Sequence, residues 1–191
     1  MKLKRINFDV VKSSNHEAIK LIKQNKNKPS IVVTKKQTHG KGTMGKKWVS
    51  ITGNIFFSIF FNLNSIKSNP MFFSRLNPRL IKKILQKYTK KKIIVKKPND
   101  LLIDKKKICG ILQEVIEFNH KKYLIIGIGI NTFFSPKNKN FSSINLQEIK
   151  KKKIKNSIII NEIKKNYENL LFDMKKYDSS NFQNEKKNIY K

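Results

Sequence analysis

A glycine- and lysine-rich stretch, residues 36–48, stands between two apolar runs and constrains the fold more than any other part of the chain. Its glycines allow backbone amides to approach a ligand closely, and its lysines supply positive charge, so the stretch suits an anionic ligand. Residues 40–46 nearly match a P-loop, but Lys47 stands where a P-loop has the Ser or Thr that contacts the metal. Residues 49–61 are rich in β-branched and aromatic side chains, whereas a P-loop opens directly into a helix. We therefore predict a phosphate- or carboxylate-binding loop between two strands.

The charge of the chain is strongly positive. Lysine and arginine number 43 against 12 acidic residues, which gives a formal net charge of +31, a balance typical of nucleic-acid-binding proteins. The basic residues are almost all lysine, because only Arg5, Arg75 and Arg79 are arginine, and they are spread along the whole sequence. Such a spread fits a biased coding sequence better than a binding stripe. We expect attraction to acidic partners but no specific nucleic-acid function.

Cysteine usage and hydropathy indicate the compartment. Cys109 is the only cysteine, so the chain forms no intrachain disulfide, and we predict that it is a small core residue. The longest apolar run, residues 55–61, is too short to cross a bilayer, and no apolar stretch of signal-peptide length follows the basic first residues. We expect a soluble, cytoplasmic protein without membrane contact.

The spacing of apolar residues predicts an α+β fold. Short apolar or alternating runs predict strands, and apolar residues three and four apart predict helices. Pro78 falls inside the second helical pattern and marks a start or a kink there. Strands that meet in hairpins favour a mixed or antiparallel sheet with helices largely to one side. The predicted strands cover residues 6–11, 31–33, 54–61, 92–96, 101–103, 107–118 and 123–130, and the predicted helices follow residues 13–15 and cover 70–88 and 157–174, with a short one entered at 142–146.

Four segments together resemble the biotin protein ligase family over about residues 5–175. They are Ser13-Ser14-Asn15; Gln37 to Gly42 with Gly45 and Trp48; Lys96-x-Pro98-Asn99-Asp100-Leu101 followed by Lys107-x-x-Gly110-Ile111-Leu112-x-Glu114; and Gly127-x-Gly129-Ile130-Asn131. The resemblance implies the class II synthetase/biotin ligase-like catalytic domain for residues 1–177 and a polar tail for 178–191. We expect no helix-turn-helix before this domain and, unlike in most of the family, no complete C-terminal β-barrel domain after it.

The implied activity is that of a biotin–[acetyl-CoA-carboxylase] ligase. Biotin and ATP, with Mg²⁺, form biotinyl-AMP and pyrophosphate, and a lysine of the biotin carboxyl carrier domain then attacks the acyl adenylate. The glycine–lysine loop suits this chemistry because a carboxylate and a triphosphate repel each other unless cations and amide donors surround them. The resemblance also suggests a homodimer formed through the sheet.

The resemblance assigns roles to individual residues. Lys107, Lys41 and Asp100 would be catalytic, with Lys107 beside the biotin carboxylate and the α-phosphate and Asp100 orienting the attacking amine or the metal. No residue is assigned as a ligand of a resident metal. Trp48, Asn99 and Asn131 would bind ATP or the adenylate, and the biotin-binding set would be Ser13, Ser14, Asn15, Gln37, Gly40, Lys41, Gly42, Thr43 and Lys107.

Simpler interpretations stand beside these roles. Lys107 is one of three lysines in a hairpin turn, Asp100 and Asn131 are common turn residues, and a Ser at a helix start is ordinarily only a cap. The sequence also departs from the family pattern. Lys41 and Thr43 stand where the family has arginines, so retention of the adenylate is expected to be looser. Lys97 replaces the tryptophan that usually precedes Pro-Asn-Asp.

Three alternatives to a biotin ligase stay open. A lipoate or octanoate ligase or transferase has the same fold and the same lysine, although Gln37 suits biotin's ureido ring better than an apolar lipoyl tail. A non-catalytic protein that binds biotinyl-AMP or carrier domains is a second alternative. A basic nucleic-acid-binding protein is the third, supported by net charge alone.

Overall fold

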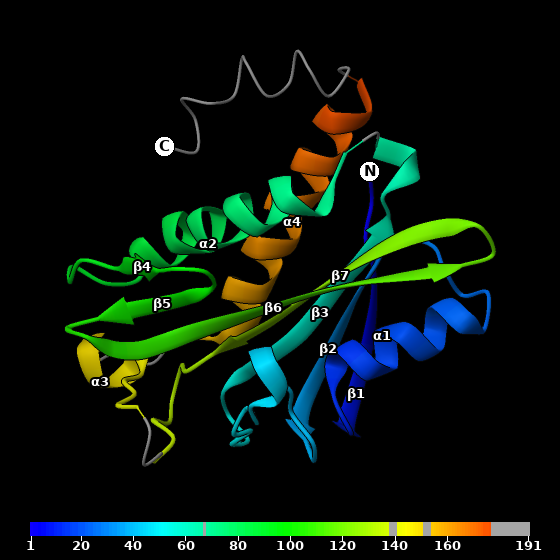
Figure 1. Ribbon diagram of the computed structural model, residues 1–191. Helices are drawn as coiled ribbons and strands as arrows, with labels where there is room; N and C mark the ends of the chain where they lie inside the picture. Colours follow the sequence, from blue (N-terminus) through cyan, green and yellow to red (C-terminus); the bar gives the residue numbers. More distant parts are fainter. Residues whose placement is uncertain (67, 138–140, 151–153, 177–191) are drawn as a thin grey trace.

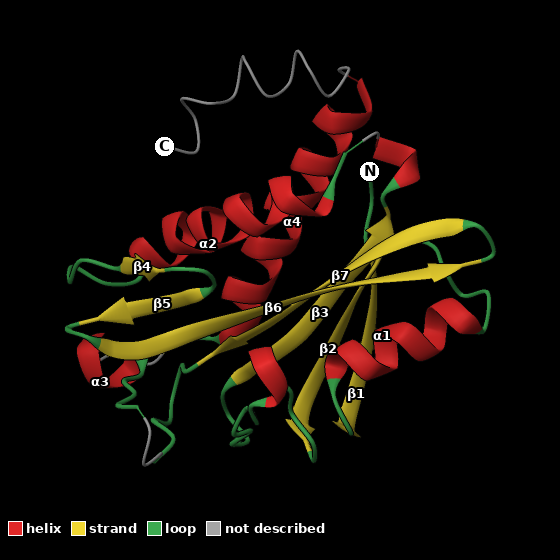
Figure 2. Ribbon diagram, in the orientation of Figure 1, coloured by secondary structure: helices red, strands yellow, loops and turns green. Residues whose placement is uncertain are grey.

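The computed structural model describes residues 1–66, 68–137, 141–150 and 154–176, so the predicted tail at 178–191 lies outside the described residues. Seven strands in this part of the chain form one mixed sheet in the order β1-β2-β3-β7-β6-β5-β4, with helices packed on it (Figures 1 and 2). The elements in chain order are β1 (Lys4–Val11), α1 (Ser14–Lys23), β2 (Ser30–Gln37), the 3₁₀ turn η1 (Thr43–Gly45), β3 (Ile55–Asn62), the 3₁₀ turn η2 (Asn64–Ile66), α2 (Pro70–Gln86), β4 (Ile94–Lys96), β5 (Asp100–Ile103), β6 (Lys106–Phe118), β7 (Lys121–Ile130), α3 (Leu146–Lys150) and α4 (Asn156–Lys176).

Among the strands of the described residues, one pair is parallel. β1 and β2 run parallel because α1 connects them across one face of the sheet, as a crossover between parallel strands requires. The other neighbours pair antiparallel, including the β5–β6 and β6–β7 hairpins predicted from the turns at 104–106 and 119–120. The α+β fold with a mixed sheet and flanking helices is therefore confirmed.

Two apolar clusters lie on opposite faces of the sheet. The larger cluster packs α2 and α4 against the odd-numbered residues of β3 and the even-numbered residues of β7. The smaller cluster packs Ala18, Leu21 and Ile22 of α1 against Phe60 and Ile125. Most helical surface is thus on one face, as expected, and α1 covers part of the other (Figure 1).

Two single-residue expectations have clear outcomes. Pro78 starts no helix, because α2 begins at Pro70, capped by the Asn69 side chain, and continues through Pro78 to Gln86. Cys109 is fully buried in the larger cluster, as predicted, and burial raises the pKa of its thiol, which keeps the sulfur protonated and unsuited to nucleophilic chemistry. Within the described residues, no helix combines the length and apolar character that a membrane span needs.

Candidate active site

The glycine–lysine stretch forms a loop that closes on itself. The amide of Trp48 donates to the Gly40 carbonyl (2.9 Å), and the amide of Gly42 donates to the Lys46 carbonyl (2.6 Å). The backbones of Lys41 and Lys47 form an antiparallel β-bridge across the loop. Gly40 is required there, because a Cβ would lie 2.5 Å from the Trp48 carbonyl oxygen. Only the short turn η1 interrupts the loop before β3, so the prediction of a loop between two strands is confirmed and a P-loop geometry is absent from this part of the chain.

This loop covers a small cavity on the α1 face of the sheet. Its free volume is about 40 Å³, which holds only a few water molecules. Nine of the thirteen residues assigned from the sequence line the cavity: Ser14, Gln37, Lys41, Gly42, Thr43, Trp48, Asn99, Asp100 and Lys107. They come from α1, the end of β2, the loop, the turn before β5 and the start of β6, so the fold collects residues that are distant in sequence.

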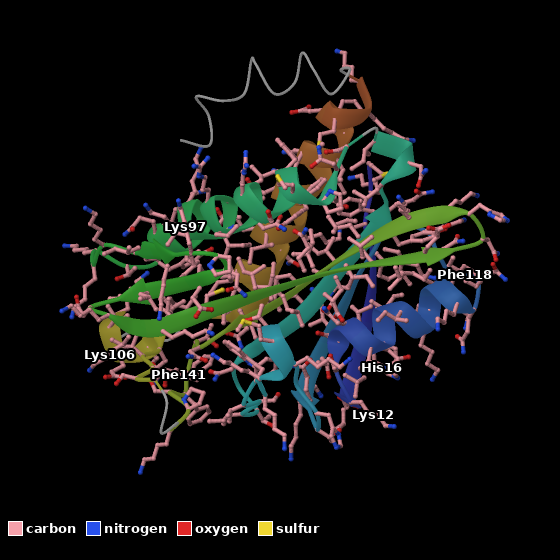
Figure 3. All side chains as sticks on the ribbon, in the orientation of Figure 1. Lys12, His16, Lys97, Lys106, Phe118 and Phe141 are labelled. Atoms are coloured by element: carbon pink, nitrogen blue, oxygen red, sulfur yellow. The ribbon has the colours of Figure 1, made fainter. Side chains whose placement is uncertain are left out.

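Lys107 is held from several sides. Its Nζ lies 2.7 Å from Asp100 Oδ1, and both side chains are largely buried. The ammonium also lies 5.1 Å from the ring centroid of Trp48 and 5.3 Å from that of Phe141, both within cation–π range. Phe141 lies at the same end of the sheet as Lys106, the first residue of β6 (Figure 3). Lys107 is therefore a fixed cation and is not one of several solvated turn lysines. Phe141 was not predicted as a site residue, because it lies in a polar loop.

A register shift in the β5–β6 pair directs Lys107 into the cavity. Leu101 pairs with Cys109 and Leu102 with Lys107, so Ile108 is an extra residue between the two pairs. Ile108 and Cys109 both point into the larger apolar cluster, which leaves Lys107 and Gly110 on the cavity face. Such β-bulges commonly redirect a side chain next to an active site.

Glycines of β6 and β7 make the floor of the cavity. Gly110 and Gly129 are paired neighbours, and a Cβ on either would lie 2.5 Å from the nearest indole atom of Trp48. A Cβ on Gly110 would also lie 3.2 Å from Lys107 Nζ. The indole and the lysine can lie on the sheet only because these two positions carry no side chain.

Ser14 and Gln37 form one end of the cavity. The backbone amide of Ser14, the first residue of α1, donates to Gln37 Oε1 (2.7 Å). This bond directs the Gln37 amide group, and its Nε2 stays available as a donor. The Ser14 hydroxyl is held 2.7 Å from the buried Ser58 hydroxyl. Two uncharged hydrogen-bonding groups are therefore fixed side by side.

A buried network supports this end from below. Asn15 lies above Gly127, its Oδ1 bonds the Ser58 hydroxyl (2.5 Å), and its Nδ2 donates to Glu114 Oε2 (2.6 Å). Both ends of the Asn15 amide are thus engaged by protein groups, and Asn15 does not line the cavity. Ser58 was not singled out from the sequence because a serine inside an apolar strand gives no signal until its cross-strand neighbour, Gly127, is known.

Four of the assigned residues do not line the cavity: Ser13, Asn15, Gly40 and Asn131. Ser13 is buried and precedes α1, but its side chain makes no capping hydrogen bond. Asn131 is 1% exposed, and its Nδ2 donates to the Lys107 carbonyl (3.1 Å). Asn99 donates to the Ile111 carbonyl (2.6 Å) and so fixes the turn that carries Asp100. Lys97 is exposed and does not line the cavity.

Two buried polar atoms at the site have no protein partner. Among the described residues, four buried side-chain atoms make no hydrogen bond, and two of them are Trp48 Nε1 and Asn131 Oδ1. Buried polar groups are nearly always satisfied by protein, water or ligand. A donor and an acceptor beside the cavity are therefore without a hydrogen-bond partner among the described protein groups. The described residues contain no cluster of three or more metal-ligating side chains.

Residues 8–131 of the chain match the family described as the biotin/lipoate A/B protein ligase family, and this segment is well over half of the sequence. The chain therefore belongs to the biotin/lipoate A/B protein ligase family. The match includes the cavity-lining residues from Ser14 to Gly129. It confirms the resemblance on which the residue assignments were based.

Several members of this family are similar to the chain in sequence or in structure. The bifunctional ligase/repressor BirA of Bacillus subtilis is 32% identical over 133 residues, which are 69% of this chain and 41% of that protein. The Escherichia coli BirA is 30% identical over 124 residues, which are 64% of this chain and 38% of that protein. The biotin protein ligase from Aquifex aeolicus, solved in complex with biotin and ATP, superposes with a TM-score of 0.77 at 25% identity, over 95% of this chain and 76% of that one. The chain thus spans about two fifths of the length of these BirA relatives.

Proposed function

We propose that this protein is an ATP-dependent biotin ligase, which forms biotinyl-AMP from biotin and ATP and then transfers biotin to a lysine of a carrier domain. The observation that carries the proposal is the placement of Lys107, a fixed cation on a glycine floor that the uncharged hydrogen-bonding groups of Ser14 and Gln37 also line. Family membership supports it, because relatives that are similar to this chain over 69% of its length are named ligases.

Strand β7 gives the site a direction. Residues 127 and 129 of this strand and residue 131 directly after it are about 7 Å apart, and they contact Asn15, Trp48 and the Lys107 carbonyl in that order. A ligand along this face would meet Ser14 and Gln37 first and Lys107 next. Asn131 and the residues after it would be at the far end, which is the position of the nucleotide in this proposal.

The first end suits biotin's ureido ring. That ring offers one carbonyl acceptor and two N–H donors and carries no charge. Gln37 Nε2 can donate to the carbonyl oxygen, and the Ser14 hydroxyl oxygen can accept from a ureido N–H. The two groups fixed at this end are uncharged, which suits a neutral polar ligand group.

Lys107 and Lys41 would lower the barrier of the first step. A carboxylate oxygen of biotin attacks the α-phosphorus of ATP, a new C(O)–O–P linkage forms, and the bond to pyrophosphate breaks. Negative charge accumulates on the α-phosphate oxygens. Lys107, which is already held in place, would stabilise it with little reorganisation, and Lys41 of the loop would add a second positive charge. The loop that carries Lys41 and Thr43 is in position to cover the adenylate.

Mg²⁺, bound to the triphosphate, would neutralise part of its charge and assist departure of pyrophosphate. The donor set of the cavity fits a metal held mainly by the substrate, because Asp100 is the one carboxylate among the described lining residues. Magnesium usually keeps one or two protein carboxylates and several phosphate or water oxygens.

The second step requires a neutral amine from the carrier lysine. Its nitrogen attacks the acyl carbon, the C–O bond to AMP breaks, and AMP leaves. We propose that Asp100 orients this amine and accepts a proton from it, and that Lys107 stabilises the departing phosphate. The excess of lysine on the protein surface would attract an acidic carrier domain.

The experiment that tests the proposal measures pyrophosphate release and labelling of a biotin carboxyl carrier domain, with biotin, ATP and Mg²⁺. Lys107→Met is expected to reduce the rate by at least about a hundredfold, because a preorganised charge at a developing anion is worth that much. Lys106→Met is the matched control, since Lys106 is the adjacent but exposed lysine and does not line the cavity. It is expected to keep the rate of the unmodified protein.

The outcomes separate the alternatives. Pyrophosphate without carrier labelling would support a protein that only makes or holds biotinyl-AMP. Labelling with lipoate or octanoate in place of biotin would support the lipoate ligase alternative, which the shared family leaves open. No biotin-dependent pyrophosphate from folded protein would refute the proposal.

A further inference from the structure

We propose that Asn54, which belongs to none of the assigned sets, is a positioning residue for the nucleotide half of the site. The inference rests on the proposed function and adds to it the device that fixes the segment following Asn131. Asn54 immediately precedes β3, and its side chain is buried, with 4% exposure.

The contacts of Asn54 use nearly all of its hydrogen-bonding capacity. Its Oδ1 accepts from the backbone amides of Thr132, Phe133 and Phe134 at 3.1, 3.0 and 3.0 Å. Its Nδ2 donates to the Phe134 carbonyl at 2.9 Å. One amide side chain thus supplies the hydrogen-bond acceptor for three consecutive backbone amides that lie outside the strands and helices.

Neighbouring groups strengthen the same junction. The Thr132 hydroxyl donates to the Gly53 carbonyl (3.1 Å), and Asn156 Nδ2, at the start of α4, donates to the same oxygen (2.7 Å). Gly53 has φ +104, and a Cβ there would lie 2.9 Å from the Phe134 ring. The turn before β3, the segment after β7 and the first residue of α4 therefore form one rigid unit.

This unit joins the two borders of the nucleotide end. Six residues before Asn54, Trp48 lies on the glycine floor, and the Ser50 hydroxyl accepts from the Gln37 amide (2.8 Å). Directly before Thr132, Asn131 presents its unpartnered Oδ1 and bonds the backbone of Lys107. By fixing residues 132–134, Asn54 sets the position of Asn131 relative to Trp48 and Lys107. Apart from the bond between Ser50 and the Gln37 backbone, the ureido-binding end is supported elsewhere, because Ser58 holds the Ser14 hydroxyl and the Ser14 amide holds the Gln37 side chain.

The test compares ATP and biotin binding of the full chain by calorimetry, each ligand measured alone. Asn54→Ser leaves three amides without their acceptor and is expected to weaken ATP binding about tenfold, while biotin binding stays within about twofold. The matched control is Asn77→Ser, which removes an equally buried asparagine that bonds Gln113 and Tyr167 on the opposite face of the sheet. It is expected to lower the melting temperature comparably and to leave both affinities unchanged.

A second variant keeps the test decisive if Asn54→Ser does not fold. Thr132→Val removes only the hydroxyl that bonds Gly53 and is expected to weaken ATP binding about threefold with biotin binding unchanged. Loss of both affinities in equal proportion, or an unchanged ATP affinity, would overturn the inference. An unmodified protein that binds neither ligand would instead refute the proposed function, so the two failures are distinguishable.

Discussion

Gly127→Ala tests whether the network beneath the ureido-binding end is organised as the structure shows. Gly127 is paired with Ser58 on one side and with Leu112 on the other, and the Asn15 side chain occupies the space above it. A methyl group at this position would overlap Asn15 Oδ1, which would have to retreat by about 1 Å to reach an ordinary contact distance. The Asn15 amide cannot make this shift without losing hydrogen bonds, because Ser58 and Glu114 hold it at both ends.

The magnitude follows from the bonds that would break. The bond to the Ser58 hydroxyl is worth about 1 kcal/mol and the charge-assisted bond to Glu114 about 2 kcal/mol, so Gly127→Ala should destabilise the protein by about 3 kcal/mol. Replacing a strand glycine by alanine returns less than about 1 kcal/mol through chain entropy. For a chain of this size the melting temperature should fall by roughly 6–10 °C, and biotin binding should weaken by about tenfold or more as Ser14 loses its support.

Thermal unfolding and biotin calorimetry on a double-mutant cycle check this reasoning. Asn15→Ala removes the atoms that the new methyl group would meet, so Gly127→Ala should cost almost nothing, or slightly stabilise, in the Asn15→Ala background. An equal loss of stability in both backgrounds would show that the glycine is needed for its backbone and not for the Asn15 side chain, and the proposed packing would be wrong.

Two further predictions concern other parts of the molecule. Thr43→Arg should slow release of biotinyl-AMP about tenfold in a filtration assay, because a guanidinium group at this cavity-lining position can form two hydrogen bonds to the phosphate. Thr43→Lys adds the charge without this paired geometry and should slow release less. Equal effects of the two variants would refute the geometric reasoning. The second prediction concerns Glu168. Burial alone would raise the pKa of its carboxyl, but hydrogen bonds from Lys164 and the Leu3 amide lower that pKa below its ordinary value of 4.5. Its stabilising effect is therefore complete above that value and lost as the pH falls through the lower, folded-state pKa, so Glu168→Gln should flatten the acid side of the stability curve, whereas Glu117→Gln, at an exposed position, should not.

Much of the fold could be predicted because local patterns and burial agree. The run from Ile55 to Phe61 is apolar on both faces of β3, and both faces are buried, so its assignment as a core strand needed no tertiary information. The helical spacing in 70–88 predicted α2 correctly. Pro70 lies in its first turn, where a proline is tolerated, and the helix continues through Pro78. Nine of the assigned residues line one cavity, since the motifs that carry them lie in the loop and at the ends of strands on one face.

What the sequence did not reveal depends on cross-strand neighbours. Asn15 belongs to a recognisable motif, yet its role as a support is visible only when Ser58, Gly127 and Glu114 are brought beside it by three separate strands. Asn54 gives even less signal, because an asparagine between a glycine and a strand is typical of any turn. Its three amide partners lie 78 to 80 residues away in the sequence.

The bulge at Ile108 is the one structural device that the sequence could have disclosed. In a regular strand, residues 107, 109, 111 and 113 share a face, and the structure places Cys109 and Ile111 of this set in the apolar core. Strict alternation would therefore bury the Lys107 ammonium in that core without a partner, which costs far more than interrupting a ladder. The apolar pair Ile108-Cys109 between a lysine and a glycine predicts that the alternation must break there. The same break brings Lys107 opposite Asp100 and above Gly110, so the residue to which we assign the chemistry reaches the cavity through an irregularity that its own burial cost requires.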